Sequence, residues 1–105
     1  MGFFHFFKKK DINEGIKQYK QTPNAILLDV RTPQEYAGGS IEGSCNLPLQ
    51  EIERVSKMVP NPQTPLFVYC LSGARSRQAS AKLERMGYIH VTNIGGINRY
   101  RGKVV

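Results

Sequence analysis

The chain has few cysteines and no pattern of metal ligands. Its 105 residues include two cysteines, Cys45 and Cys70, which are too few for the disulfide framework of a small secreted domain. There is no CxxC pair, and the two histidines, His5 and His90, stand alone in the sequence. We therefore expect neither a metal nor another cofactor, and the cysteine usage suits a reducing, cytoplasmic location.

The chain also lacks an apolar run of membrane-spanning length. Its first segment, MGFFHFFKKK (residues 1–10), places phenylalanines before lysines. A spanning helix needs about 20 apolar residues, and a secretory signal carries its charges before its apolar region. We expect residues 1–10 to form an aromatic and basic arm. This arm either packs on the domain or contacts a membrane surface or a second copy of the chain.

Acidic residues are scarce relative to basic ones. The 15 lysines and arginines exceed the 8 aspartates and glutamates, so the formal net charge is +7. Such a surface attracts anions. The only basic run is residues 8–10, however, and no zinc-finger or aromatic RNA-binding signature accompanies it. The composition therefore favours small anionic partners, and no nucleic acid is expected.

The sequence contains neither an internal repeat nor a low-complexity segment. Its length suits one domain, which we expect over residues 11–105. Strand and helix patterns alternate along it. Strands are expected at residues 25–30, 44–49, 66–70 and 90–94, and helices at residues 11–20, 32–36, 50–58 and 75–86, with a short helix after residues 95–96. This alternation predicts an α/β domain with a mostly parallel sheet.

Charged and reactive side chains stand at the ends of two expected strands. Asp29 and Arg31 follow the apolar run at residues 25–28, and Cys70 ends the run LFVYC. In parallel α/β sheets, ligands bind beyond the C-terminal ends of the strands. The short helix that begins after Thr32 carries a capping box, because Glu35 stands three residues later. These features place a candidate site at that edge of the sheet.

The segment YCLSGARS, residues 69–76, combines a thiol with an anion-binding turn. Backbone N–H groups converge in such a strand-to-helix turn, and the helix dipole adds partial positive charge. Gly73 permits the required backbone conformation, and Arg75 adds a full charge. A thiol in this position has a lowered pKa, so the sequence predicts a nucleophilic thiolate on Cys70 at neutral pH. The alternative is a buried cysteine whose glycine turn serves geometry alone.

Three stretches of the chain resemble the rhodanese family. They are LLDVRTPQEYAGGSIEGSCNLPL (residues 27–49), LFVYCLSGARSRQASAKLERMGY (66–88) and VTNIGGINRYRG (91–102), which occur in the family's order. The resemblance is to a stand-alone, single-domain form. It implies a rhodanese-like α/β fold, with a parallel five-stranded sheet flanked by helices on both faces.

The resemblance also implies the chemistry. Cys70 would accept a sulfane sulfur as a persulfide and hand it to a thiol or to cyanide, with thiosulfate or another persulfide as the small anionic donor. A protein persulfide is a further candidate partner. The resemblance makes Arg75 the arginine that closes the active loop, places Arg31 near an anionic donor, and gives Asp29 a structural role. The candidate catalytic residues are Cys70 and Arg75, and the candidate substrate-binding residues are Arg31, Leu71, Ser72, Gly73, Ala74 and Ser76.

Related phosphatases share this architecture and use a similar thiolate loop, but their loop places five residues between the cysteine and the arginine. Four residues, 71–74, separate Cys70 from Arg75. The shorter loop favours sulfur transfer over phosphate-ester cleavage. A sulfur carrier or binding module without turnover stays open as the second alternative.

Other positions carry smaller expectations. Cys45 is expected to be a core residue of a strand, with a resolving thiol as the alternative. Ser72 and Ser76 either donate hydrogen bonds within the loop or cap the following helix, and we favour Ser76 as the cap. The sequence departs from the family's pattern at Ser40, where histidine is usual, and at Tyr100, where tryptophan is common.

Overall fold

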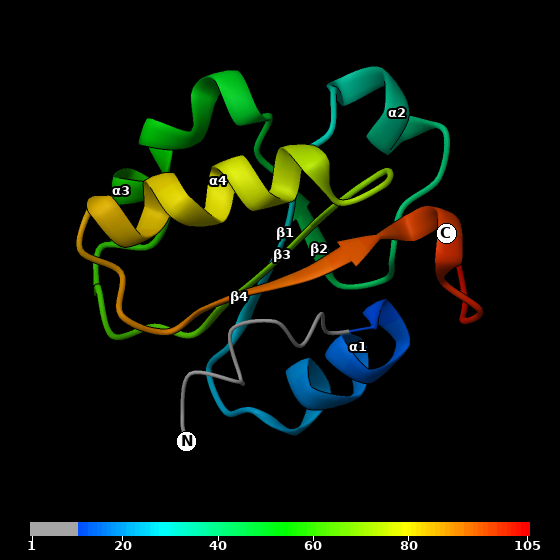
Figure 1. The fold of residues 1–105 in the computed structure, drawn as a ribbon, viewed down its shortest axis with the longest axis horizontal. Helices are drawn as coiled ribbons and strands as arrows, with labels where there is room; N and C mark the ends of the chain where they lie inside the picture. Colours follow the sequence, from blue (N-terminus) through cyan, green and yellow to red (C-terminus); the bar gives the residue numbers. More distant parts are fainter. Residues whose placement is uncertain (1–10) are drawn as a thin grey trace.

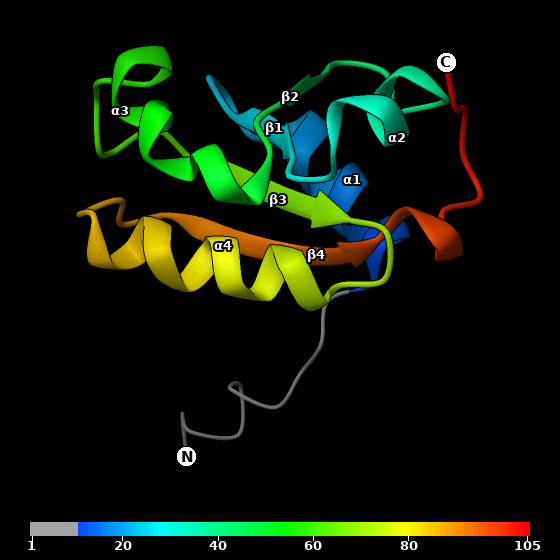
Figure 2. The same ribbon diagram turned by 90° about the horizontal axis from the view of Figure 1, so that it is seen from above.

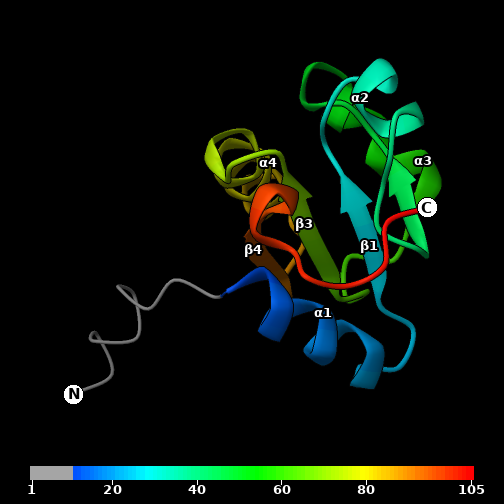
Figure 3. The ribbon, with the colours of Figure 1, turned by 90° about the vertical axis from the view of Figure 1, so that its right-hand side faces the viewer.

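The computed structural model describes residues 11–105, so the arm expected at residues 1–10 lies outside the described residues. Four strands form a single parallel sheet in the order β2-β1-β3-β4. They are β1 (Ile26–Asp29), β2 (Ser44–Asn46), β3 (Leu66–Cys70) and β4 (Val91–Gly96). Figure 3 shows the twisted sheet between its helices.

The expected fifth strand is not found within residues 11–105, so that prediction is wrong for the part of the chain that the structure describes. These residues contain four extended segments that pair as ladders. The C-terminal segment contributes only an isolated antiparallel bridge between Ile41 and Val104. Backbone hydrogen bonds of 3.0 and 2.8 Å between Ser40 and Val105 hold this segment beside the end of α2 (Pro33–Ala37).

Helices cover both faces of the sheet, as expected (Figure 1). α1 (Ile12–Gln21) packs on one face, near the short 3₁₀ helix η3 (Ile97–Arg99). On the opposite face lie the 3₁₀ helix η2 (Leu49–Arg54), α3 (Val55–Met58) and α4 (Ala74–Arg85). Within residues 11–105, none of these helices is long and apolar enough to cross a bilayer.

Two apolar clusters follow from this layering, one on each side of the sheet. Leu28, Val68 and Leu83 belong to the cluster under α4, whereas Ile16, Phe67 and Ile94 belong to the cluster under α1. Fully burying one such side chain contributes about 1.5–3 kcal/mol. Alternate residues of β1 and β3 therefore face opposite clusters, and this alternation fixes which side chains reach each face.

Two element predictions differ from the structure in detail. The strand expected at residues 44–49 ends at Asn46, although the N–H groups of Leu47 and Leu49 still donate to the carbonyls of Asp29 and Val30. The helix expected at residues 50–58 divides into η2 and α3, and Glu51 has non-helical φ and ψ of −112° and 17°. Both differences leave the sheet order unchanged.

The chain connections diverge at the carboxyl ends of β1 and β3. From β1 the chain crosses through α2 to β2 on one side, and from β3 it crosses through α4 to β4 on the other. A sheet whose connections diverge in this way has a topological switch point, where ligands bind beyond the carboxyl ends of the strands. In Figure 2 the loop from β3 to α4 lies at the same end of the molecule as α2.

Candidate functional site

Cys70 ends β3 and lies buried at the switch point, with 1 % of its surface exposed. The next residues turn sharply into α4, and Gly73 adopts a φ of 108° at the start of that helix. A residue with a side chain is strained in this left-handed region. The turn aims the N–H of Gly73 at the Cys70 Sγ over 3.0 Å, and the N–H of Ser76 donates to the same sulfur over 3.3 Å. The loop therefore forms a nest of donors around the sulfur.

This environment sets the acidity of the thiol. Burial by itself raises the pKa of Cys70. A hydrogen bond with the Ser76 hydroxyl and hydrogen bonds from the backbone N–H groups of residues 72, 73 and 76 lower it by more, so the pKa lies below its ordinary value. Donors that point at the sulfur stabilise the thiolate over the thiol. The predicted lowering of the Cys70 pKa is thus confirmed in direction.

Ser76 does not cap α4, so the favoured prediction for this residue is wrong. Gly73 occupies the N-cap position, and Ser76 lies in the first turn of the helix with none of its surface exposed. Its hydroxyl donates to the carbonyl of Gly73 over 3.1 Å and lies 3.5 Å from the Cys70 Sγ. The hydroxyl therefore belongs to the sulfur environment, which was the other role that the sequence left open.

The remaining loop residues form the rim of the site. Leu71 and Ala74 are exposed, with 44 % of Leu71 open to solvent, and the Ser72 side chain is also exposed.

Gly96 packs directly against the backbone of the cysteine loop, a contact that the sequence did not reveal. A Cβ atom added to Gly96 would lie 2.2 Å from the carbonyl oxygen of Leu71 and 2.6 Å from the Cα of Ser72. The N–H of Asn98 also donates to the Leu71 carbonyl over 3.1 Å. The pair GG at residues 95–96 was visible in the sequence, but only the sheet brings it against the cysteine loop.

Arg75 points toward α2 and forms a bidentate ion pair with Glu35. The Nη1–Oε1 and Nη2–Oε2 distances are 2.7 and 3.0 Å, and about a third of each side chain is exposed. The Thr32–Glu35 capping box, which was predicted, is present and fixes the carboxylate. Hydrogen bonds from Arg75 and from Thr32 lower the pKa of Glu35 to about 2. The sequence thus predicted the role of Glu35 in the helix cap, but it did not predict the ion pair between Glu35 and Arg75.

Glu35→Gln tests this ion pair through acid stability. Glutamine still completes the capping box, so the variant removes the charge and one of the two contacts with Arg75, because its NH₂ group cannot accept a hydrogen bond. We expect a loss of about 1 kcal/mol at pH 7, the upper end for partly exposed pairs, because the contact is bidentate. A lowered carboxyl pKa contributes stability above the ordinary value of 4.5, and that contribution disappears as pH falls toward about 2.

Urea denaturation followed by circular dichroism at a series of pH values measures the difference between wild type and Glu35→Gln. The two stabilities should converge between pH 4.5 and 2. Glu42→Gln, which removes an exposed carboxylate, is the matched control. A difference for Glu35→Gln that does not change with pH would contradict the ion-pair explanation.

Arg31 lies at the end of β1 with 5 % of its surface exposed. Its backbone N–H and its guanidinium donate to the Asp29 carboxylate over 2.7–3.1 Å, and its Nη2 also donates to the Gly39 carbonyl over 2.7 Å. The guanidinium stacks 5.8 Å from the ring centre of Tyr69. Asp29 therefore has the expected structural role. The hydrogen bonds that the Arg31 guanidinium donates are therefore with residues at the end of β1 and just after α2, and not with the cysteine loop.

Cys45 is exposed, so the prediction that it is a core residue is wrong. It lies on β2, a three-residue strand at the edge of the sheet. β1 lies between β2 and β3, and neighbouring strands are about 4.8 Å apart, so the Cα atoms of the two cysteines are at least roughly 10 Å apart. Disulfides require Cα atoms within about 7 Å. Cys45 is therefore not placed to attack a sulfur held on Cys70.

The assembled site is a single buried cysteine sulfur surrounded by backbone N–H donors, beside an arginine–glutamate pair. Within residues 11–105 there is no cluster of three or more residues with metal-binding side chains. Such a site suits nucleophilic attack on a soft, electrophilic atom followed by its transfer.

Comparisons with known proteins show which family this chain resembles. A family model described as a Rhodanese-like domain matches residues 12–103. Thiosulfate sulfurtransferase PspE of Escherichia coli (strain K12) is 42% identical over 71 residues, which cover 67% of this chain and 68% of that protein. A protein named Sulfurtransferase from Allochromatium vinosum is 40% identical over 75 residues, covering 71% and 69% of the two chains.

A solved structure described as "rhodanese with anions from E. coli" has the same fold. It superposes with a TM-score of 0.72 at 38% identity, and the match covers 77% of this chain and 96% of that chain.

Proposed function

The chain belongs to the family of rhodanese-like domains, and we propose that residues 11–105 form a single sulfurtransferase domain that carries sulfane sulfur on Cys70. The observation that carries this proposal is the nest of N–H donors around the buried Sγ, with contacts of 3.0 and 3.3 Å. The names of similar proteins support sulfur transfer as the class of reaction.

The first step is attack of the Cys70 thiolate on a sulfane sulfur. With thiosulfate as donor, a bond forms between Sγ and the outer sulfur. The sulfur–sulfur bond of thiosulfate breaks, and sulfite leaves with the electron pair. The loop N–H groups stabilise the negative charge on the resulting persulfide. Sulfite is a good leaving group, so the step needs no proton donor.

The second step returns the thiolate. A nucleophile, either a thiolate or cyanide, attacks the outer sulfur of the persulfide, and the Sγ–S bond breaks with the electron pair returning to Cys70. The products are an acceptor persulfide or thiocyanate. In this scheme Arg75 supplies positive charge at the rim for an anionic donor, and the Arg31–Asp29 pair positions the wall of the site. The exposed residues Leu71, Ser72 and Ala74 contact the donor.

The charge state of the neighbouring carboxyls disfavours a phosphatase. Cleavage of a phosphate ester benefits from a carboxylic acid that protonates the leaving oxygen. Arg75 holds the pKa of Glu35 at about 2, so this carboxyl is ionised at neutral pH. Asp29 is fully buried against Arg31. Glu35 therefore offers no proton to a leaving oxygen, in keeping with the four-residue loop.

The test is the intact mass of the reduced protein after incubation with thiosulfate. We expect a gain of one sulfur atom that cyanide removes with release of thiocyanate. A protein that gains no sulfur from thiosulfate or from glutathione persulfide would contradict the proposal. Hydrolysis of an aryl phosphate without sulfur transfer would instead favour the phosphatase. Sulfur uptake without release to cyanide or a thiol would favour the carrier.

A further inference from the structure

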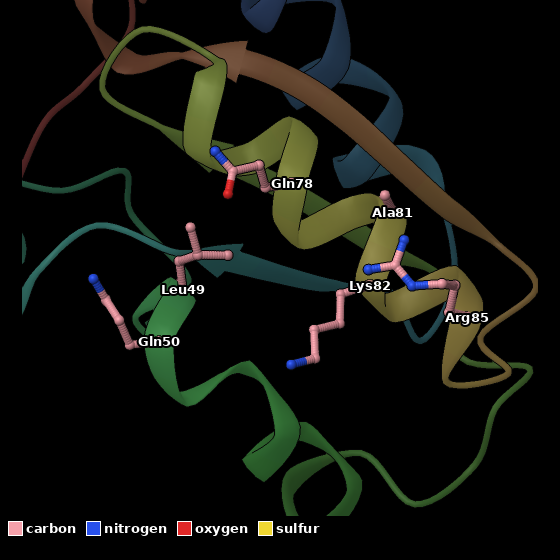
Figure 4. A pocket seen from close by; sticks show the side chains of 6 residues that line it. All are labelled: Leu49, Gln50, Gln78, Ala81, Lys82 and Arg85. Carbon is pink, nitrogen blue, oxygen red and sulfur yellow. The ribbon is translucent and has the colours of Figure 1, made fainter.

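A second surface feature lies along α4, outside the cysteine loop. A groove of about 410 Å³ separates α4 from η2 and is lined by Leu49, Gln50, Gln78, Ala81, Lys82 and Arg85. Figure 4 shows Leu49 and Gln50 on the 3₁₀ segment, across from the side chains of α4. None of the catalytic roles described above uses these side chains.

We propose that this groove docks an acidic, extended segment of a protein that exchanges sulfur with Cys70. The inference rests on the proposed sulfur transfer for its purpose, but the docking itself is a separate property of the surface. The expected partner has a chain segment with clustered carboxylates a short distance from the end that carries or accepts sulfur.

The charge of the groove supports an anionic occupant. α4 carries four basic residues and a single acidic one, Glu84. Arg85 is exposed and forms no ion pair within residues 11–105. Lys82 pairs over 3.1 Å with Glu53, whose side chain is 75% exposed, so this contact is easily exchanged. A carboxylate in the groove therefore meets one free and one weakly held cation.

The other lining groups suit a peptide backbone. The side-chain amides of Gln50 and Gln78 are exposed and make no hydrogen bond with other residues among 11–105. Each amide offers both a donor and an acceptor, which match the N–H and C=O groups of an extended chain. Leu49 and Ala81, both partly buried, provide apolar contact between them. This mixture fits a polypeptide better than a small inorganic anion.

The direction of the groove connects it to the reacting sulfur. Positions 75, 78, 82 and 85 repeat along one face of α4, starting in the first turn beside the cysteine loop. From Arg75 to Arg85 the helix rises about 15 Å, at 1.5 Å per residue. An extended chain covers this length with about four or five residues. A segment whose carboxylates contact Lys82 and Arg85 would therefore bring a residue four or five positions away to the rim of Cys70.

Synthetic peptides test the proposal. The probe carries one cysteine, a four-residue glycine–serine spacer and three glutamates, and the matched peptide has glutamine in place of glutamate. Stopped-flow kinetics of sulfur transfer from the Cys70 persulfide give a rate for each peptide. We expect the acidic peptide to react about tenfold faster at low ionic strength, a modest value for electrostatic attraction, and salt to reduce the ratio.

The variant Lys82→Gln/Arg85→Gln should bring this ratio close to one. The control Lys17→Gln/Lys20→Gln removes the same charge from α1, on the opposite face of the sheet, and it also includes one lysine with a surface partner, Glu14. It should retain the ratio. Expressing the result as a ratio cancels any general effect on the persulfide. Equal rates for the two peptides with wild type, or an unchanged ratio in the groove variant, would overturn the proposal.

Binding of a fluorescent probe with serine in place of cysteine separates docking from chemistry. Its anisotropy should rise with wild type and with the control variant, and rise less with the groove variant. If the protein forms no persulfide, the proposed function fails, and this measurement still decides the docking. A short oligothymidylate or inorganic phosphate that binds more tightly than the acidic peptide through Lys82 and Arg85 would assign the groove to phosphate ligands and overturn the proposal.

Discussion

Cys70→Ser is expected to abolish sulfur transfer, with a loss of at least about 10³-fold, as is typical when a covalent nucleophile is removed. A serine hydroxyl retains the hydrogen bonds but does not ionise at neutral pH, so it cannot attack a sulfane sulfur. Intact mass after thiosulfate should show no added sulfur, and thiocyanate formation should fall to the rate without protein. The fold should remain, because serine is slightly smaller than cysteine and the loop N–H groups at 3.0 and 3.3 Å keep an acceptor.

Cys45→Ser is the matched control for this prediction. Cys45 is exposed on the edge strand, with β1 between it and the strand that carries Cys70. The variant should take up one sulfur and transfer it at the wild-type rate. Sulfur transfer by Cys70→Ser, or loss of sulfur transfer in Cys45→Ser, would show that Cys70 is not the residue that carries the sulfur. Either result would contradict the mechanism.

Gly96→Ala is expected to produce the second-largest effect, although Gly96 does not contact the sulfur. Its φ of −119° is accessible to alanine, so the cost comes from collision alone. The added Cβ would lie 2.2 Å from the Leu71 carbonyl oxygen, which is backbone and must move with its loop. We expect a stability loss of about 1–3 kcal/mol from overpacking. Sulfur transfer should fall roughly 10- to 100-fold, the size of effect that a misplacement of about 1 Å produces at a reacting centre.

The pH dependence of Cys70 alkylation distinguishes this displacement from a general loss of stability. Moving the loop lengthens the donor contacts to Sγ, so the alkylation midpoint of Gly96→Ala should rise relative to wild type. Gly87→Ala is the control: a φ of +107° makes alanine strained there, but no atom lies within 4 Å of the added Cβ. It should be destabilised without a change in the midpoint. An unchanged midpoint in Gly96→Ala would show that Gly96 does not position the loop.

Local sequence was sufficient for much of the fold and for the loop that follows Cys70. The Thr32–Glu35 capping box, the buried run that ends at Cys70 and the positive φ at Gly73 all depend on residues within a few positions of one another. Spacing of this kind is visible directly in the chain, because caps and turns are made by near neighbours. The lowered pKa of Cys70 follows from the same short segment.

Other features depended on burial, which the sequence shows less directly. Cys45 has the residue type and the strand context of a core position, yet it is exposed because β2 lies at the sheet edge. Ser76 stands where a helix cap is plausible, but the turn at Gly73 starts the helix earlier and turns the serine hydroxyl toward the sulfur. The number of strands was overestimated because it was taken from the family resemblance, whereas the strand patterns in the sequence itself marked four segments.

The sequence by itself determined an α/β domain with a cysteine at the start of a glycine turn between a strand and a helix, since these features depend on periodicity and on contacts between near neighbours. Tertiary structure alone decided that Arg75 pairs with Glu35 and that Gly96 packs against the cysteine loop. It also opened the groove beside α4. The physical reason is the order and register of the parallel strands: these fix which distant segments meet at the switch point, and no local pattern encodes that geometry.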